Sequence, residues 1–250
     1  PVSFEKGGQG GAVWSPDGKA VAIRARQKEA DPYQLFVRYL ESPAPAQITA
    51  VPDGVGAISA WTTTGRIVFV RVSSRSLWSV SPVGGEPEPF GPEPEGPKLD
   101  PIATPRVSQD GKTVAGVFRA EDGVASIWTW SPGDARPKSY EPAPFATRTV
   151  LTGVSLRFSP DGRQLLLVRD AGGNGQEAWL MPYPADAANP PRQIFEGLAE
   201  SRATPTFSWM PDNRHIVLSA STPGGTSQLY MGDTISSALT VFSSGTRAQI

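Results

Sequence analysis

The stretch Trp14-Ser15-Pro16-Asp17-Gly18, followed by the apolar run Val21-Ala22-Ile23, decides the fold because its pattern returns four more times. Each copy has a large residue, then usually Ser or Thr, then a tight turn and an apolar run. Pro presets φ at the first corner of such a turn, Asp bonds to nearby backbone, and Gly or Asn tolerates positive φ. The copies therefore predict turns between paired strands. The other four begin at Trp61, Val107, Phe158 and Trp209.

The spacing of the copies indicates the architecture. The turn Gly or Asn stands at positions 18, 65, 111, 162 and 213, so the intervals are 47, 46, 51 and 51 residues. Periods of roughly 40–50 residues are typical of propeller blades or of helical arrays. No apolar period of 3.6 residues is sustained between the copies, which excludes the helical arrays. Two further strand-like segments follow each turn hairpin, such as residues 34–40 and 46–49 in the first copy. Each period thus predicts one four-stranded antiparallel blade.

The predicted fold is an all-β propeller with five complete blades plus an extra strand, derived from a six-bladed ring. A single domain is expected over residues 1–250, with residues 1–6 as an extra outer strand. A ring must join its ends to remove exposed edges, so either a sixth blade is missing or the extra strand docks on the fifth blade. The blades are expected at about residues 12–50, 57–91, 104–141, 154–196 and 205–243. The large residues before the turns (Trp14, Trp61, Phe158 and Trp209) are expected to pack between blades.

Composition excludes several classes of function. The net charge of -1 and the pI of about 6.0 argue against a nucleic-acid surface, which needs a basic stripe. No run of 18 apolar residues is present, so no membrane insertion is expected. Cysteine is absent, which excludes disulfides, thiolate metal sites and a cysteine nucleophile. The sequence starts at Pro1 without a signal-peptide pattern, so we expect it to be part of a longer chain.

No catalytic centre is predicted. The single histidine, His215, stands between the fifth turn and an apolar strand, where a polar residue commonly begins a strand. Residues 153–157 come closest to a nucleophile elbow but lack its final glycine. One histidine without cysteine leaves too few ligands for a tetrahedral zinc site. We therefore expect no enzyme activity, no cofactor and no metal.

Three other patterns have a functional and a structural interpretation. The turn aspartates, one per blade, favour turn capping over metal binding, because ligands must converge on one point. Residues 170–175 resemble a calcium loop loosely, but they favour a hairpin loop. The proline-rich stretch 87–105 predicts either a polyproline II ligand or, as we favour, a stiff connector between blades.

A ligand is expected at the mouth of the central channel, among the loops that join blades. Arg106 and Arg157 stand on inner strands, two residues before the turn serine. There they are candidate anchors for an anion or a carboxylate, or else they form ion pairs between blades. Three further candidates lie in the loops between blades, namely Asp100, Arg148 and Arg202.

The repeated Ser-Pro-Asp-Gly turn before an apolar strand resembles the TolB-like propeller repeat, over nearly the whole chain. Copies one and four match it fully, whereas copy three has Gln109, copy two keeps only Gly65, and copy five has Asn213. Residues 34–40 and 77–86 resemble blades at the C-termini of some bacterial serine/threonine kinases and transcriptional regulators.

This resemblance implies a non-catalytic recognition or scaffold module that binds a protein, a peptide or a small ligand. It implies the sensor domain of a larger bacterial protein in an extracytoplasmic location, periplasmic or at the cell surface. The alternative is the gating propeller that precedes the hydrolase domain of a prolyl-oligopeptidase-like serine peptidase. Fold alone does not transfer function, so the flanking gene sequence would separate the two.

Overall fold

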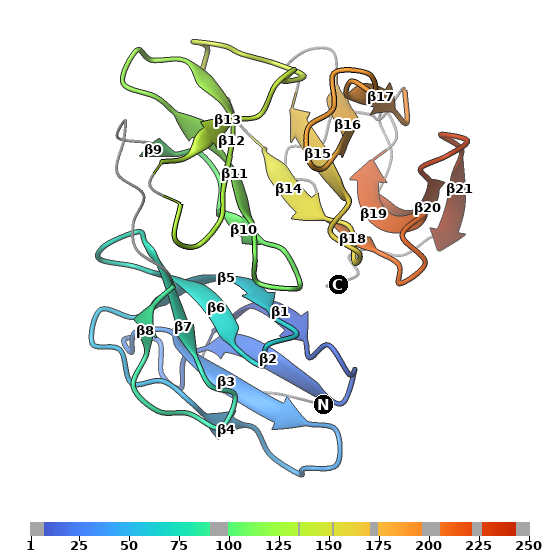
Figure 1. Cartoon of the computed structure of the whole chain (residues 1–250). Helices are drawn as coiled ribbons and strands as arrows, with labels where there is room; N and C mark the ends of the chain where they lie inside the picture. Colours follow the sequence, from blue (N-terminus) through green and yellow to red (C-terminus); the bar gives the residue numbers. More distant parts are fainter. Residues whose placement is uncertain are drawn as a thin grey trace. The chain divides into compact units, whose positions relative to one another are not determined.

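The computed structural model describes residues 8–90, 100–134, 136–151, 153–170, 175–196, 206–221 and 227–243. The described chain contains β-strands and no helix (Figure 1). Its strands form five antiparallel sheets, each built on four consecutive strands, as predicted for the blades of a propeller. The extra strand predicted at residues 1–6 lies outside the described residues.

The strands follow the chain in the order of the sequence copies. The first sheet comprises β1 (Gln9–Trp14), β2 (Ala20–Ala25), β3 (Gln34–Tyr39) and β4 (Ala46–Gln47). The second comprises β5 (Val55–Trp61), β6 (Ile67–Arg71), β7 (Leu77–Val80) and β8 (Glu88–Pro89). The third comprises β10 (Arg106–Val107), β11 (Val114–Arg119), β12 (Ala125–Trp130) and β13 (Lys138–Ser139), with β9 (Asp100–Pro101) paired to β11. The fourth comprises β14 (Ser155–Phe158), β15 (Gln164–Asp170), β16 (Gln176–Pro182) and β17 (Arg192–Ile194). The fifth comprises β18 (Thr206–Trp209), β19 (His215–Ser221), β20 (Ser227–Asp233) and β21 (Leu239–Ser243).

The chain divides into two compact units. Unit 1 comprises Pro1–Glu95, Val107–Val114 and Trp130–Arg136, and unit 2 comprises Gly96–Arg106, Ala115–Thr129 and Pro137–Ile250. The first two sheets therefore belong to unit 1, the last two belong to unit 2, and strands of the third sheet contribute to both. A single domain over residues 1–250 stays a prediction.

The repeated turn is held by the hydrogen bonds that its residue types predict. In the first copy, Ser15 Oγ donates to Asp17 Oδ1 at 2.6 Å and accepts from the Ala20 amide at 2.9 Å. The hydrogen bond from Ser15 lowers the pKa of the Asp17 carboxyl. Gly18 has a φ of 69°, which a residue with a Cβ rarely adopts. The same serine–aspartate bond recurs at Asp110 and Asp161, so capping by these aspartates is confirmed.

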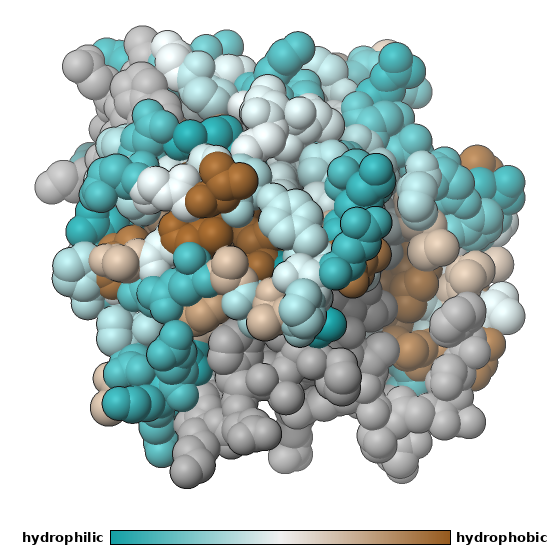
Figure 2. Space-filling model, turned by 90° about the horizontal axis from the view of Figure 1, so that it is seen from below, coloured by the Kyte–Doolittle hydropathy of each residue, from teal (hydrophilic) through white to brown (hydrophobic). Residues whose placement is uncertain are grey.

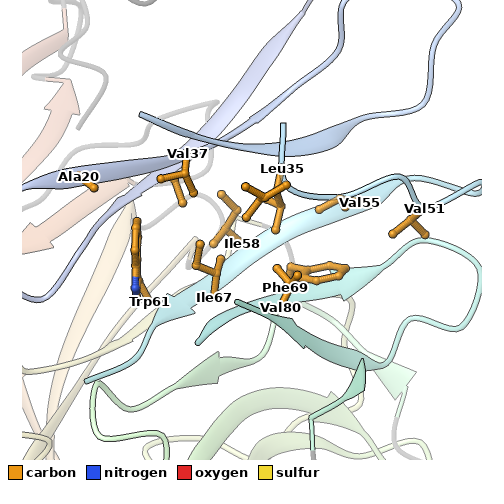
Figure 3. Packing of buried hydrophobic residues seen from close by; sticks show 12 residues of the cluster. Ala20, Leu35, Val37, Val51, Val55, Ile58, Trp61, Ile67, Phe69 and Val80 are labelled. Atoms are coloured by element: carbon orange, nitrogen blue, oxygen red, sulfur yellow. The ribbon is translucent and has the colours of Figure 1, made fainter. Parts of the chain in front are cut away.

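The core of unit 1 lies between the first two sheets. Leu35 and Val37 of β3 point toward Ile58 of β5 and toward Ile67 and Phe69 of β6 (Figure 3). These side chains are at least nine-tenths buried, and burying each contributes about 1.5–3 kcal/mol relative to exposure. Period-2 alternation on each strand directs these residues to the same interface.

The core of unit 2 explains why the second strand of each sheet is a continuous apolar run in the sequence. Leu165 and Leu167 of β15 pack in a cluster with β11 and β12, whereas Leu166 and Val168 pack in a cluster with β18 and β19. Because successive side chains of a strand alternate between faces, β15 is covered on both faces. A blade between two neighbours therefore needs apolar residues at every position of this strand.

The large residues before the turns do not all pack as expected. Trp61 is 7% exposed and lies in the core of unit 1, and Phe158 and Trp209 pack against the clusters of unit 2. Trp14, in contrast, is 60% exposed, so its predicted place in a core is wrong. The reason is positional: Trp61 faces the preceding sheet, whereas the described part of unit 1 contains no sheet before β1.

Candidate functional site

The two inner-strand arginines predicted from sequence both belong to unit 2, with Arg106 on β10 and Arg157 on β14. Burial lowers the pKa of both guanidinium groups, and repulsion by Arg157 lowers the pKa of Arg106 further, to about 9. Guanidinium groups are not deprotonated in proteins, so Arg157 brings a positive charge into a poorly solvated environment. Such a charge is costly without a counter-charge.

Arg157 lies against the neighbouring inner strand. Its Cζ is 5.9 Å from the ring centroid of Phe207, on β18. Its Nε atom is buried and has no hydrogen-bond partner among the described residues. The alternative interpretation of Arg157, an ion pair between blades, is not formed within the described part of the chain.

The three loop candidates have different outcomes. Arg148 is exposed, and its Nε donates to the Asp122 carbonyl, so it lies against the β11–β12 turn. The backbone of Asp100 pairs with Arg119 in β9. The Asp100 side chain and the whole of Arg202 lie outside the described residues. A ligand role for these residues stays a prediction.

A second set of arginines was missed by the sequence analysis. Arg24, Arg71, Arg119 and Arg169 stand at or near the end of the second strand in the first four sheets, and each finds a partner. Arg24 donates to the Val55 carbonyl, while Arg119 donates to the carbonyls of Gly123, Arg148 and Thr149. Arg71 and Arg169 pair with Asp53 and Glu177, at 3.0 and 2.7 Å. The sequence feature that could have identified them is an arginine at the end of four of the apolar runs.

Three of these arginines also lie over an aromatic ring. Arg24 is 3.6 Å from the ring centroid of Tyr33, Arg71 is 4.7 Å from that of Trp78, and Arg169 is 4.9 Å from that of Phe145. Such stacking holds the planar guanidinium in one orientation. The second-strand arginines thus fix the ends of the blades and leave few donors for a ligand.

Unit 1 carries an open groove of about 450 Å³ between the first and second sheets. One wall is the segment that leaves β4, including Ala50 and Pro52, and the other is the β7–β8 hairpin, including Val83 and Pro87. Trp78, Arg71 and Phe69 also line the groove, and Trp78 is paired with Phe69 across β6 and β7. Figure 2 shows one face of the molecule, on which apolar side chains gather among hydrophilic ones. The lining of the groove is mixed, because it also includes the polar residues Gln47, Thr49 and Glu86.

The single histidine belongs to a turn. His215 Nδ1 lies 2.6 Å from Asp212 Oδ2, and this hydrogen bond lowers the pKa of the Asp212 carboxyl to about 2. Asp212 also accepts the backbone amides of Arg214 and His215, as a capping residue does. The described residues contain no group of three metal-ligating side chains. None of the described segments is a helix that could cross a membrane.

Comparison with known proteins gives the fold. No family model and no curated protein matches the sequence. TolB from Acinetobacter baumannii matches in structure with a TM-score of 0.61 and 16% identity, over 96% of this chain and 53% of that one. The chain therefore spans about half the length of that protein.

Two other solved structures are similar. A nidogen/laminin complex matches with a TM-score of 0.62 and 12% identity, over 94% of this chain and 79% of that one. A structure from an analysis of two prolyl endopeptidases matches with a TM-score of 0.55 and 13% identity, over 94% of this chain and 40% of that one. At these identities the likeness concerns the fold and not the activity. With its five antiparallel sheets, each built on four consecutive strands, the chain has the TolB-like β-propeller fold.

Proposed function

We propose that this chain is a recognition module that performs no chemistry and binds an extended segment of a partner protein or peptide. The single observation that carries this proposal is the open groove of unit 1, whose mixed polar and apolar lining includes Trp78 and Arg71. Tryptophan and arginine are enriched among residues that dominate binding energy. A partly open groove suits a segment of a partner chain better than an enclosed small molecule.

The aromatic group in the groove is held in place before any partner arrives. The indole Nε1 of Trp78 donates to Ser76 Oγ at 3.1 Å, and the Arg71 guanidinium lies over its ring. Arg71 is itself fixed by Asp53, which also accepts the Ser73 amide at 2.9 Å. Groups that are ordered in advance lose little conformational entropy on binding, so this arrangement favours affinity.

The proposal is tested by selecting extended peptides from a displayed library against the whole chain and measuring their Kd by titration calorimetry. Val83 forms the rim of the groove and is 83% exposed, so Val83→Glu should leave folding unchanged and weaken binding at least tenfold. Val150→Glu is the matched control, because Val150 is equally exposed (83%) but lies in unit 2. Equal affinity of both variants would place the binding elsewhere, and a library that yields no binder would end the proposal.

The similar structures support recognition as the role of such a fold, because one of them is a nidogen/laminin complex. The resemblance of residues 34–40 and 77–86 to kinase-attached propellers extends the proposal to a sensor segment of a longer bacterial protein.

A second candidate is a gating propeller of a prolyl-oligopeptidase-like enzyme. It is favoured by the structural match to prolyl endopeptidases, of which the chain covers 40%. A gene that encodes a hydrolase segment after residue 250 would favour this candidate, and one that encodes a kinase or DNA-binding segment would favour the sensor. Either way, we expect no hydrolysis of peptide substrates by the 250-residue chain alone.

A further inference from the structure

A second site, in unit 2, is indicated by hydrogen-bond donors that lack acceptors. The Nε atom of Arg157 and the indole Nε1 of Trp209 are both buried and have no hydrogen-bond partner among the described residues. Neither group can accept a hydrogen bond, so only an acceptor can satisfy them. Buried polar groups without partners are rare and costly, and each requires an explanation.

These donors lie on the facing sides of neighbouring inner strands. Arg157 is paired across the fourth sheet with Leu166, which packs in the cluster between the fourth and fifth sheets. Phe207 and Trp209 are two residues apart on β18, so they share one face of that strand, and both pack in the same cluster. The interface between these two sheets therefore receives the guanidinium and the indole together.

The charge of Arg157 is not balanced by an ion pair within the described residues. The ring of Phe207 lies against Arg157, which leaves the in-plane N–H groups of the guanidinium for an acceptor. A poorly solvated environment strengthens the attraction of an anion to this guanidinium.

Arg157 and Trp209 are each only partly buried as whole residues, although the donor atoms named above are shielded from solvent. An acceptor would therefore approach Arg157 through the exposed part of its side chain.

We propose that Arg157, assisted by Trp209, binds a carboxylate, presented by an acidic side chain, by a chain terminus or by a small organic acid. A carboxylate is planar and offers two oxygens to the planar fork of a guanidinium. This site lies in unit 2 and does not depend on the groove of unit 1, so either proposal can fail without the other.

Thermal unfolding of the 250-residue chain in rising sodium succinate, against sodium chloride at matched ionic strength, tests the site. At about 100 times Kd, succinate should raise Tm by on the order of 5–10 °C, because it binds only the folded chain. Arg157→Met should abolish this shift. Arg163→Met removes an equal charge from an exposed position in the turn between β14 and β15 and should keep the shift.

A second variant keeps the proposal testable if Arg157→Met fails to fold. Trp209→Phe keeps the aromatic packing but removes the indole donor, so it should fold and bind succinate severalfold more weakly. Peptides with a free or an amidated C-terminus separate a chain terminus from a small acid as the source. An equal shift by chloride, an unaltered shift in Arg157→Met, or a shift by inorganic phosphate without one by succinate would each overturn the carboxylate site.

Discussion

Two classes of arginine in this chain have the same side chain and opposite surroundings. Those that end the second strands donate to carbonyls or carboxylates and stack on rings, as Arg71 does with Asp53 and Trp78. The inner-strand Arg157 contacts a ring but has no acceptor within the described chain. The difference teaches that position within the blade, and not residue type, decides whether the N–H groups of a guanidinium already have acceptors within the fold.

The largest expected effect is at Arg119. Arg119→Ala removes donors from the carbonyls of Gly123, Arg148 and Thr149. Hydrogen bonds from a charged donor are worth about 1.5–3 kcal/mol, so the free energy of unfolding should fall by roughly 2 kcal/mol. Urea unfolding measures it, with Arg163→Ala as an exposed control. A loss no larger than that of the control would remove Arg119 from the structural class.

A smaller loss is expected for Glu177→Gln. Its carboxylate pairs with Arg169 at 2.7 Å and also accepts the Trp179 indole N–H at 3.2 Å, and both charged side chains are less than one-third exposed. The amide keeps the shape but loses the charge, so about 1 kcal/mol should be lost. Chemical denaturation in low and high salt would check this, because most of the difference should disappear at high salt.

The opposite sign is expected for Arg157→Met in buffer without added carboxylate. Removing a buried charge that has no counter-charge should leave the free energy of unfolding unchanged or raise it by up to about 1 kcal/mol. Differential scanning calorimetry compares the two proteins directly. A destabilisation above roughly 2 kcal/mol would show that Arg157 stabilises the fold, as the second-strand arginines do.

The smallest effect concerns pH in the structural class. Hydrogen bonds from Ser73, and then from Arg71, lower the pKa of the Asp53 carboxyl well below its usual value of 3.8. The unfolded chain therefore binds this proton first as the pH falls. The contribution of Asp53 to stability is complete above about pH 4 and is lost as the pH falls further. Acid titrations of the wild type and Asp53→Asn should differ above pH 4 and converge below it.

The sequence predicted the sheets well because turn chemistry is local. Ser15, Asp17 and Gly18 interact within a few residues, so their pattern identifies a turn wherever it occurs. The packing of one sheet on the next was predicted less well. The prediction that the large residue before the turn is buried is right for Trp61 and wrong for Trp14. Burial at this position depends on which sheet precedes the strand.

The candidate site was predicted in part. Arg157 stood out because an arginine is unusual on an inner strand, and the structure shows it without an acceptor in the described chain. The second-strand arginines were overlooked because several partners are backbone carbonyls about 30 residues away, such as Val55 for Arg24. Backbone acceptors have no residue type to recognise. The groove was not foreseen either, because its walls come from segments that meet only after two sheets have packed.

The two-sided burial of β15 has a consequence for how such a chain can change. Leu165 to Val168 leave no face toward solvent, so a charged substitution there would disturb the sheets on both sides at once. A whole blade, in contrast, carries its own turn, its own strands and two ready-made faces. Gain or loss of a complete repeat therefore disturbs this architecture less than one misplaced charge, which makes the blade, and not the residue, its natural unit of variation.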